Sequence, residues 1–157
     1  MRTCTTAFRD RTFKDGNNTR KIPAWQQEDE MRDCSIQLTN NPGDLGRVAQ
    51  ALGRRGVNIK ALAAITVGGT AMARILPDDI VVARSAFEAA NIRFTESEVH
   101  LVTLENKAGV LASLTNRLGD EGINLEALYV TGVADDLVEL AIASDNPKKA
   151  KKILEEF

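Results

Sequence analysis

The sequence has few of the residues that most catalytic and metal sites use. Its 157 residues include one histidine, His100, and only two cysteines, Cys4 and Cys34. One histidine and two widely spaced cysteines are too few for a zinc tetrahedron or for a set of paired disulfides. We therefore expect no metal or other cofactor, and we expect a reducing, cytoplasmic compartment.

Charge and hydropathy argue against two further classes of protein. The formal net charge is −2, from 20 basic and 22 acidic side chains, whereas proteins that hold nucleic acid by its phosphates usually carry a basic face. The longest apolar run, at 61–65, is much shorter than the roughly 18 residues of a membrane-spanning helix. We expect neither a nucleic-acid partner nor a membrane partner.

Residues 1–33 have the composition of a flexible N-terminal extension. Apolar residues there lack periodic spacing, and 15–20 and 28–30 are polar, as solvated linkers are. Met31 lies just before the first clear strand pattern, so three interpretations stay open. The extension precedes a natural start at Met31, is a genuine flexible tail, or is an organellar transit peptide. Four arginines suit a transit peptide, whereas Asp10 and Asp15 do not.

The rest of the chain contains an internal repeat. When the sequence is shifted by 66 residues, ten identical residues coincide within a 25-residue window, which chance does not produce. In the first copy these are Leu38, Asn40, Gly43, Leu45, Leu52, Gly53, Gly56, Asn58, Ala61 and Leu62. Their counterparts are Leu104, Asn106, Gly109, Leu111, Leu118, Gly119, Gly122, Asn124, Ala127 and Leu128. We call residues 34–97 the first repeat and residues 98–157 the second repeat.

The first repeat predicts a strand followed by a helix. Residues 35–39 alternate between apolar and polar side chains, as a half-buried strand does. Asn41 as N-cap and Pro42 in the first helical position then predict a helix that Gly56 ends.

A hairpin, a second helix and a final strand complete the first repeat. Strands at 58–67 and 70–76 flank the turn signal Gly68-Gly69. A helix started by Asp78 or Asp79 and a short strand at 92–95 follow. The order β-α-β-β-α-β predicts an α+β fold, with two ferredoxin-like units in tandem, each an antiparallel sheet with its helices on one face.

The second repeat has the same pattern but ends after its second helix, which begins at Asn146 or Pro147. It is therefore predicted to lack its last strand, which leaves one edge of the strand at 99–104 unpaired. Three alternatives remain for the segment that pairs with this edge: the N-terminal tail, a neighbouring subunit, or the last strand of the first repeat, which continues into it through 96–98.

Two pairs of motifs carry a family resemblance. Asn40-Asn-Pro-Gly-Asp-Leu45 with Gly56-Val-Asn-Ile59 resembles the ACT domain, a small ligand-sensing module, and 105–111 with 122–125 resembles it again. The chain is similar to short stand-alone proteins of two tandem ACT domains. This resemblance implies a non-catalytic regulatory protein that binds a small metabolite, in general an amino acid, at interfaces between ACT domains.

The resemblance also implies the position of the binding site. A helix start offers unpaired N–H groups to a carboxylate, a glycine there permits close approach, and asparagine amides bind either end of a zwitterion. The implied ligand-binding residues are Asn40, Asn41, Gly43, Asp44, Leu45 and Asn58 in the first repeat, and Asn106, Gly109, Val110, Leu111 and Asn124 in the second. Leu38 and Leu104 stand where some relatives carry a histidine, and Ala108 replaces Pro42, so serine specificity does not follow.

Most of these residues also have a purely structural interpretation. The glycines permit tight turns, and the asparagines cap helices or bond their own turns. His100 is interpreted as a strand residue rather than a base, and Cys34 as a small hydrophobic residue. The lysines of 148–152 are interpreted as a solvated helix face.

Catalysis is not expected. The repeated polar residues are asparagines, which do not titrate and so cannot act as general acid or base. A second function stays open, that of an interaction subunit that docks onto a biosynthetic enzyme or a transcription factor without binding a ligand. We expect a homodimer in either case, because the small sheets leave edges to be paired.

Overall fold

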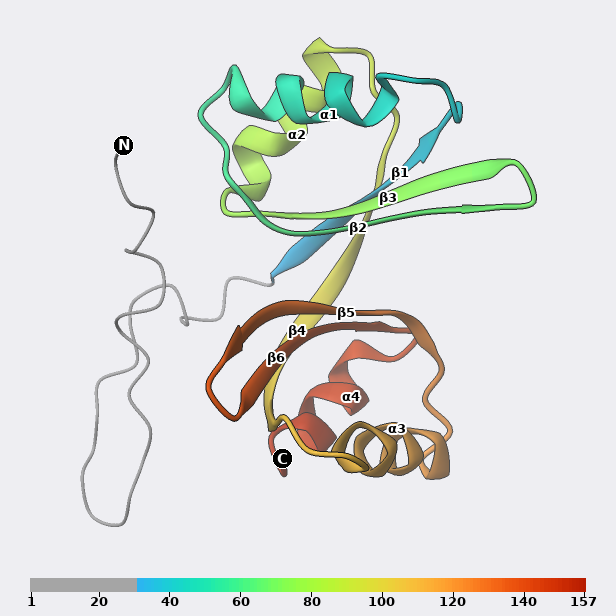
Figure 1. The fold of residues 1–157 in the computed structure, drawn as a ribbon, viewed down its shortest axis with the longest axis vertical. Helices are drawn as coiled ribbons and strands as arrows, with labels where there is room; N and C mark the ends of the chain where they lie inside the picture. Colours follow the sequence, from blue (N-terminus) through green and yellow to red (C-terminus); the bar gives the residue numbers. More distant parts are fainter. Residues whose placement is uncertain (1–30) are drawn as a thin grey trace. The chain divides into compact units, whose positions relative to one another are not determined.

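The computed structural model describes residues 31–157, so the expected extension at 1–30 lies outside the described residues. Ten elements follow one another (Figure 1). They are β1 (Arg32–Leu38), α1 (Asp44–Gly53), β2 (Ile59–Val67), β3 (Thr70–Pro77), α2 (Ile80–Ala89), β4 (Thr95–Glu105), α3 (Val110–Asp120), β5 (Leu125–Ala134), β6 (Leu137–Ser144) and α4 (Pro147–Leu154).

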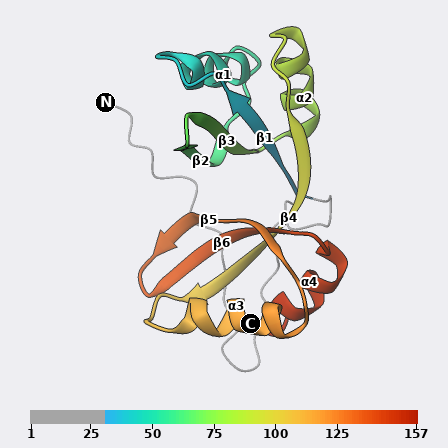
Figure 2. The ribbon, with the colours of Figure 1, turned by 90° about the vertical axis from the view of Figure 1, so that its right-hand side faces the viewer.

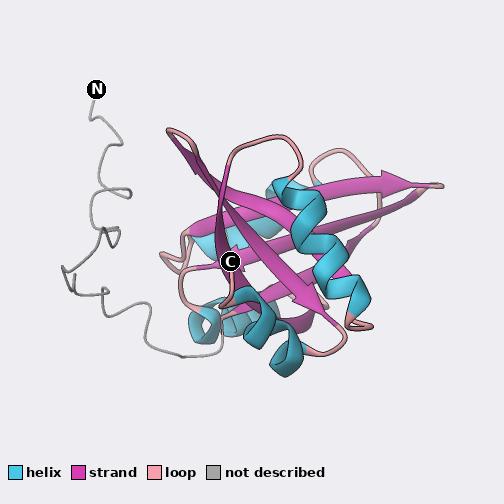
Figure 3. Ribbon diagram, turned by 90° about the horizontal axis from the view of Figure 1, so that it is seen from below, coloured by secondary structure: helices cyan, strands magenta, loops and turns pink. Residues whose placement is uncertain are grey.

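The strands form a six-stranded antiparallel sheet with the order β2-β3-β1-β4-β6-β5. The helices pack on the strands of their own repeat, α1 and α2 in the first and α3 and α4 in the second. Figure 3 distinguishes these helices, in cyan, from the strands, in magenta. The predicted α+β class is therefore confirmed for residues 31–157, and so is the order of elements except at β4.

Strand β4 belongs to both repeats. Its residues 95–98 pair with β1, and its residues 99–105 pair with β6 (Figure 2). The expectation of two strands, at 92–95 and 99–104, is wrong: one strand begins at Thr95 and runs without a break to Glu105. The reason is that each half of β4 has its own antiparallel partner. The predicted boundary between 97 and 98 falls inside this strand, and the division into two domains stays a prediction.

One side of β4 is only partly paired within the described residues. Met31, just before the start of β1, accepts a hydrogen bond of 2.8 Å at its carbonyl oxygen from the N–H of Val99 in β4. Beyond that point, residues 100–105 have β6 as their strand partner on one side and no second strand within 31–157. The expected open edge is therefore present there.

Helix α1 begins later than the sequence predicts. Its N-cap is Gly43, in the left-handed region with φ 92°, rather than Asn41. The N–H of Asp44 donates to the carbonyl oxygen of Asn41 at 3.2 Å, so residues 41–44 form a turn before the helix. The proline therefore lies in this turn and not in the first helical position.

Local signals placed the starts of α2 and α4 correctly. Asp79 caps α2, since its Oδ1 accepts from the N–H of Val82 at 2.9 Å. Asn146 caps α4, since its Oδ1 accepts from the N–H of Lys149 at 3.2 Å. These side chains satisfy N–H groups that have no partner inside their helices.

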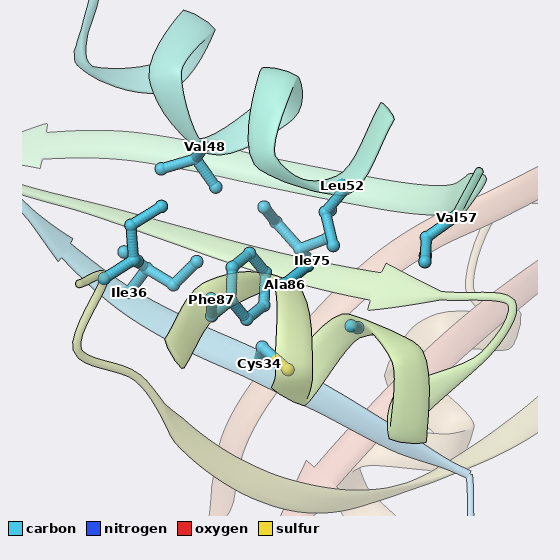
Figure 4. Close-up of a cluster of buried hydrophobic side chains, with 10 residues drawn as sticks. Cys34, Ile36, Val48, Leu52, Val57, Ile75, Ala86 and Phe87 are labelled. Carbon is cyan, nitrogen blue, oxygen red and sulfur yellow. The ribbon is translucent and has the colours of Figure 1, made fainter. Parts of the chain in front are cut away.

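Each repeat has its own core between sheet and helices, and a third cluster lies where the two halves of the sheet face each other. Figure 4 shows the first core, in which Val48 and Leu52 of α1 and Phe87 of α2 pack on Ile36 of β1. The third cluster comprises Ala61, Leu76, Val99, Tyr129, Ala141 and Ala143. Since neighbouring residues of a strand point to opposite faces, Ile75 of β3 belongs to the first core and Leu76 to the third cluster. The sheet faces away from the helices therefore pack against each other.

A buried charged network crosses between the repeats beside this third cluster. Asp33 is fully buried and accepts two hydrogen bonds from the guanidinium of Arg74, of 2.7 and 2.8 Å. The hydroxyl of Tyr129, on β5, donates to Asp33 Oδ2 at 3.0 Å. The sequence places Asp33 in the N-terminal extension, and this boundary is wrong: β1 begins at Arg32, and Asp33 lies within it with two hydrogen-bonded partners from distant parts of the chain.

Candidate functional site

A pocket of about 420 Å³ lies where β1 ends and α1 begins. Its wall includes five of the residues that the sequence implicates in ligand binding. The full lining is Leu38, Asn40, Asn41, Pro42, Gly43, Asp44, Leu45, Gly46, Ala64, Ile65, Thr66, Ala71 and Met72. Volumes of this size are typical of small-molecule sites.

Asp44 organises the loop that forms one side of the pocket. Its Oδ2 accepts hydrogen bonds from the N–H of Thr39 at 2.8 Å, from the Thr39 hydroxyl, and from the N–H of Asn41 at 3.3 Å. The Thr39 hydroxyl and then the backbone bond from Asn41 hold the pKa of the Asp44 carboxyl below its ordinary value. The carboxylate therefore stays charged at the positive end of the α1 dipole.

The backbone of this loop has unusual conformations at two positions. Gly43 has φ 92° and Asn40 has φ 62°, a region that glycine enters freely and asparagine more readily than most residues. No side chain caps α1, so the first-turn N–H groups are free of side-chain acceptors. Such N–H groups at a helix start are suited to a ligand carboxylate.

The opposite wall of the pocket is apolar. Leu38, Ala64 and Ala71 lie on the sheet face that carries α1, because β1 pairs Leu38 with Ala71 and β2 pairs Ala64 with Ala73. Ile65 and Met72 alternate with these residues along β2 and β3, so their side chains lie on the other face of the sheet, where they are exposed to 63% and 40%. Thr66 adds one polar contact, since its hydroxyl donates to Asn40 Oδ1 at 3.4 Å.

The corresponding residues of the second repeat lie at the connection between β4 and α3. Gly109 is the N-cap of α3 with φ 93°, and Val110 and Leu111 begin the helix. The N–H of Asn106 donates to the carbonyl oxygen of Asp136 at 2.7 Å. Asn106 does not share the positive φ of Asn40, so the two loops differ in conformation.

Asn58 and Asn124 lie away from these connections. The N–H and Nδ2 of Asn58 donate to the carboxylate of Asp78 at 2.9 and 3.0 Å, and the N–H of Asn124 donates to Asp145 Oδ1 at 3.0 Å. Thr66 in the pocket wall lies eight positions after Asn58 along β2, a span of about 26 Å in an extended strand. Within one chain the structure does not bring Asn58 together with Asn40.

The residues interpreted as structural have structural contacts. His100 Nε2 lies 2.9 Å from the carbonyl oxygen of Pro147, and Cys34 is fully buried in the first core. Lys149 of α4 donates to the carbonyl oxygen of Glu121 at 2.6 Å and pairs with its carboxylate at 3.0 Å. The sequence analysis does not single out Thr39, Ala64 or Ala71. These residues differ in type from their counterparts in the second repeat, and a position-by-position comparison of the repeats could have marked them.

Residues 31–157 contain no group of three or more His, Cys, Asp or Glu side chains placed to hold a metal ion. No helix in this part of the chain is long and apolar enough to cross a membrane.

Comparison with known proteins gives likeness in structure only. No family model matches the sequence, and no curated protein matches it. Protein BT0572 from Bacteroides thetaiotaomicron has a TM-score of 0.72 and 24% identity, over 80% of this chain and 87% of that one. The regulatory subunit of aspartate kinase from Thermus thermophilus, in its ligand-free form, has a TM-score of 0.60 and 19% identity, over 82% and 93%.

A whole aspartate kinase is also similar. The enzyme from Clostridium acetobutylicum has a TM-score of 0.54 and 16% identity, over 81% of this chain and 32% of the enzyme. At these identities the likeness shows the fold alone. The described chain has an α+β fold with a six-stranded antiparallel sheet and four helices that resembles the regulatory subunit of aspartate kinase.

Proposed function

We propose that the chain is a cytoplasmic, non-catalytic regulatory protein of two tandem ACT-type units that binds a free amino acid in the pocket between β1 and α1. The observation that carries this proposal is that the pocket gathers Asn40, Asn41, Gly43, Asp44 and Leu45. The likeness in fold to a regulatory subunit supports a regulatory role. Binding acts on the protein by favouring one packing of the units over another.

The chemistry of the pocket suits a zwitterion. The ligand carboxylate accepts hydrogen bonds from the N–H groups at the start of α1, where the helix dipole is positive. The ligand ammonium pairs with the Asp44 carboxylate and with Asn40 Oδ1. Because Oδ2 of Asp44 already accepts hydrogen bonds from the loop, Oδ1 is the oxygen that meets the ammonium. The ligand side chain then lies toward the apolar wall of Leu38, Ala64 and Ala71.

We propose further that Asn58 and Asn124 contact the ligand bound to another copy of the chain. A homodimer supplies that copy and covers sheet edges, since β2 and β5 are the outer strands of the sheet. Four large apolar residues on β2 are exposed, Ile59 to 36%, Leu62 to 40%, Ile65 to 63% and Val67 to 70%. Sedimentation that shows a monomer at micromolar concentration contradicts the dimer. Unchanged ligand affinity in the Asn58→Ala, Asn124→Ala double variant contradicts these two contacts.

Calorimetry of the full chain against each of the twenty amino acids tests ligand binding. Asn40→Ala is expected to weaken binding by about 2- to 12-fold, the equivalent of one hydrogen bond. Asn91→Ala is the matched control, because Asn91 also has a positive φ, of 50°, but lies in the loop after α2. Both variants strain the backbone alike, so a loss of affinity confined to Asn40→Ala reports ligand contact.

A second candidate function is docking onto an enzyme or transcription factor without a ligand. The exposed apolar side chains on the outer strand β2 favour it, because an unpaired strand edge is a template for another chain. No heat from any amino acid, together with co-purification of a larger enzyme, favours this candidate over the first.

A further inference from the structure

The two repeats differ at the residues that form the apolar wall of the pocket. β1 pairs Leu38 with Ala71, whereas β4 pairs Leu104 with Val138, so Val138 is the counterpart of Ala71. In the same way Val130, which pairs with Leu140, is the counterpart of Ala64, which pairs with Ala73. A bulge in β5 between Val130 and Gly132 adds one residue, so the shift between repeats changes from 66 to 67 there. Both small residues of the first repeat are valines in the second.

The loop of the second repeat also lacks the chemistry of the first. Val110 stands in the place of Asp44, and Glu105 and Lys107 replace Thr39 and Asn41. Instead of three hydrogen bonds to one carboxylate, Glu105 and Lys107 form an exposed ion pair of 2.9 Å. Val110 and Val138 both pack against the second core. Larger apolar side chains therefore occupy these positions in the second repeat.

We propose, on the basis of the proposed function, that the chain has one effector site, the pocket of the first repeat, and that this site selects an amino acid with a compact aliphatic side chain. Ala64 and Ala71 keep the site open, and Val110 and Val138 close its counterpart in the second repeat. One ligand therefore binds per chain, although the repeats share their glycines and asparagines.

The wall determines the class of ligand. Leu38, Ala64 and Ala71 offer no hydrogen bond from a side chain, and the Thr66 hydroxyl already donates to Asn40 Oδ1. A charged or hydroxyl-bearing ligand side chain would therefore lose water without gaining a partner from these three residues. Each methylene buried against this wall is worth roughly fourfold in affinity. Affinity should therefore rise from L-alanine through L-valine to L-leucine and be weaker for L-serine and L-lysine.

The experiment is calorimetry of the full chain with these five amino acids. We expect one mole of L-leucine per mole of chain, bound at least tenfold more tightly than L-serine or L-lysine. Ala64→Val should weaken L-leucine binding by at least tenfold, and Val130→Ala is its matched control. Both positions are exposed on outer strands, so neither change disturbs a core. Ala71→Val and Val138→Ala repeat the comparison at buried and half-buried positions, with thermal melting to check folding.

The outcomes separate this inference from the proposed function. Two moles of ligand per chain, undiminished binding in a folded Ala64→Val variant, or tighter binding of L-serine or L-lysine overturns the inference and leaves amino-acid binding standing. Loss of binding in Val130→Ala overturns it too, because the second repeat would then hold a site. No binding of any of the twenty amino acids overturns the proposed function, and this inference with it.

Discussion

The hydroxyl of Tyr129 donates a hydrogen bond of 3.0 Å to Asp33 Oδ2, although 96 positions separate the two residues in the sequence. The bond joins β5 of the second repeat to β1 of the first. Burial, and then the nearby Asp33 carboxylate, raise the pKa of Tyr129 above its ordinary value, so the phenol stays protonated as the donor. The guanidinium of Arg74 binds the same carboxylate, and this bond raises the pKa of Arg74. Tyr129 thus joins the second repeat to the first by a charge-assisted hydrogen bond, and the acceptor carboxylate is held in place by Arg74 of the first repeat.

Tyr129→Phe should lower the free energy of unfolding. It removes a hydrogen bond to a buried charged group, which is worth about 1.5–3 kcal/mol. Urea denaturation of both proteins measures the difference. An unchanged free energy of unfolding would show that Arg74 alone satisfies the Asp33 carboxylate.

Ser144→Ala is the matched comparison and should have the opposite sign. Ser144 is buried to 6% exposure, and its hydroxyl has no hydrogen-bond partner within the described residues. Removing an unsatisfied buried hydroxyl at nearly constant volume should raise the free energy of unfolding by about 1 kcal/mol. A loss of stability in this variant would reveal a partner for the hydroxyl, such as a bound water.

Gly43→Ala and Gly46→Ala should change stability in opposite directions. Gly43 has φ 92°, where an alanine costs about 1–2 kcal/mol. Gly46 lies in the first turn of α1 with an ordinary φ and open space around its Cα, so alanine there should stabilise the helix by about 0.4–1 kcal/mol. Thermal unfolding of the two variants gives the comparison. Equal effects would mean that the loop relaxes out of the left-handed conformation.

Features set by neighbouring residues could be predicted from the sequence. The caps Asp79 and Asn146 and the turn at Gly68-Gly69 involve contacts within a few residues, and the structure confirms all three. Strand β4 was predicted as two pieces because its pairing with β1 joins residues about 60 positions apart, which periodicity does not reveal. The burial of Asp33 was missed for the same reason, since Arg74 and Tyr129 lie far along the chain.

The same distinction between local and distant contacts applies to the candidate site. Residues 40–45 form one continuous motif, and the structure places five of its members around a pocket. Ala64 and Ala71 were missed because a small apolar residue carries no chemical signal by itself. Their role follows only from the register that sets them opposite valines of the second repeat. Asn58 was grouped with Asn40 by resemblance, yet β2 carries it to the far end of the strand.

Cys34 should be unreactive in the folded protein. Burial, and then the charges of Glu96 and Asp33, raise the pKa of its thiol to about 12, so almost no thiolate exists at neutral pH. A Cys4→Ser variant isolates Cys34 as the single thiol. A disulfide reagent at about pH 8 should detect no thiol in the native variant and one thiol after unfolding in guanidinium chloride. Rapid reaction in the native state would show that the first core opens.

The ion pair between Arg84 and Glu96 should make stability depend on pH in the acid range. The guanidinium binds both carboxylate oxygens of Glu96, at 2.7 and 2.9 Å, and joins α2 to β4. This bond holds the pKa of Glu96 below its ordinary value of 4.5. A depressed carboxyl pKa gives stability that is fully present above the ordinary value and is lost as the pH falls through the lowered folded-state value.

Glu96→Gln should therefore lower the free energy of unfolding at about pH 7, and the deficit relative to the parent protein should shrink towards about pH 3. Urea denaturation at a series of pH values measures this deficit directly. Glu155→Gln is the control, since Glu155 is exposed at the end of α4 and should leave the pH dependence unchanged. A deficit that stays constant from neutral to acid pH would mean that the ionisation of Glu96 contributes nothing and that glutamine loses stability only through altered packing or hydrogen bonding. A deficit that grows towards acid pH would reverse the sign of the linkage and place the pKa of Glu96 above its ordinary value.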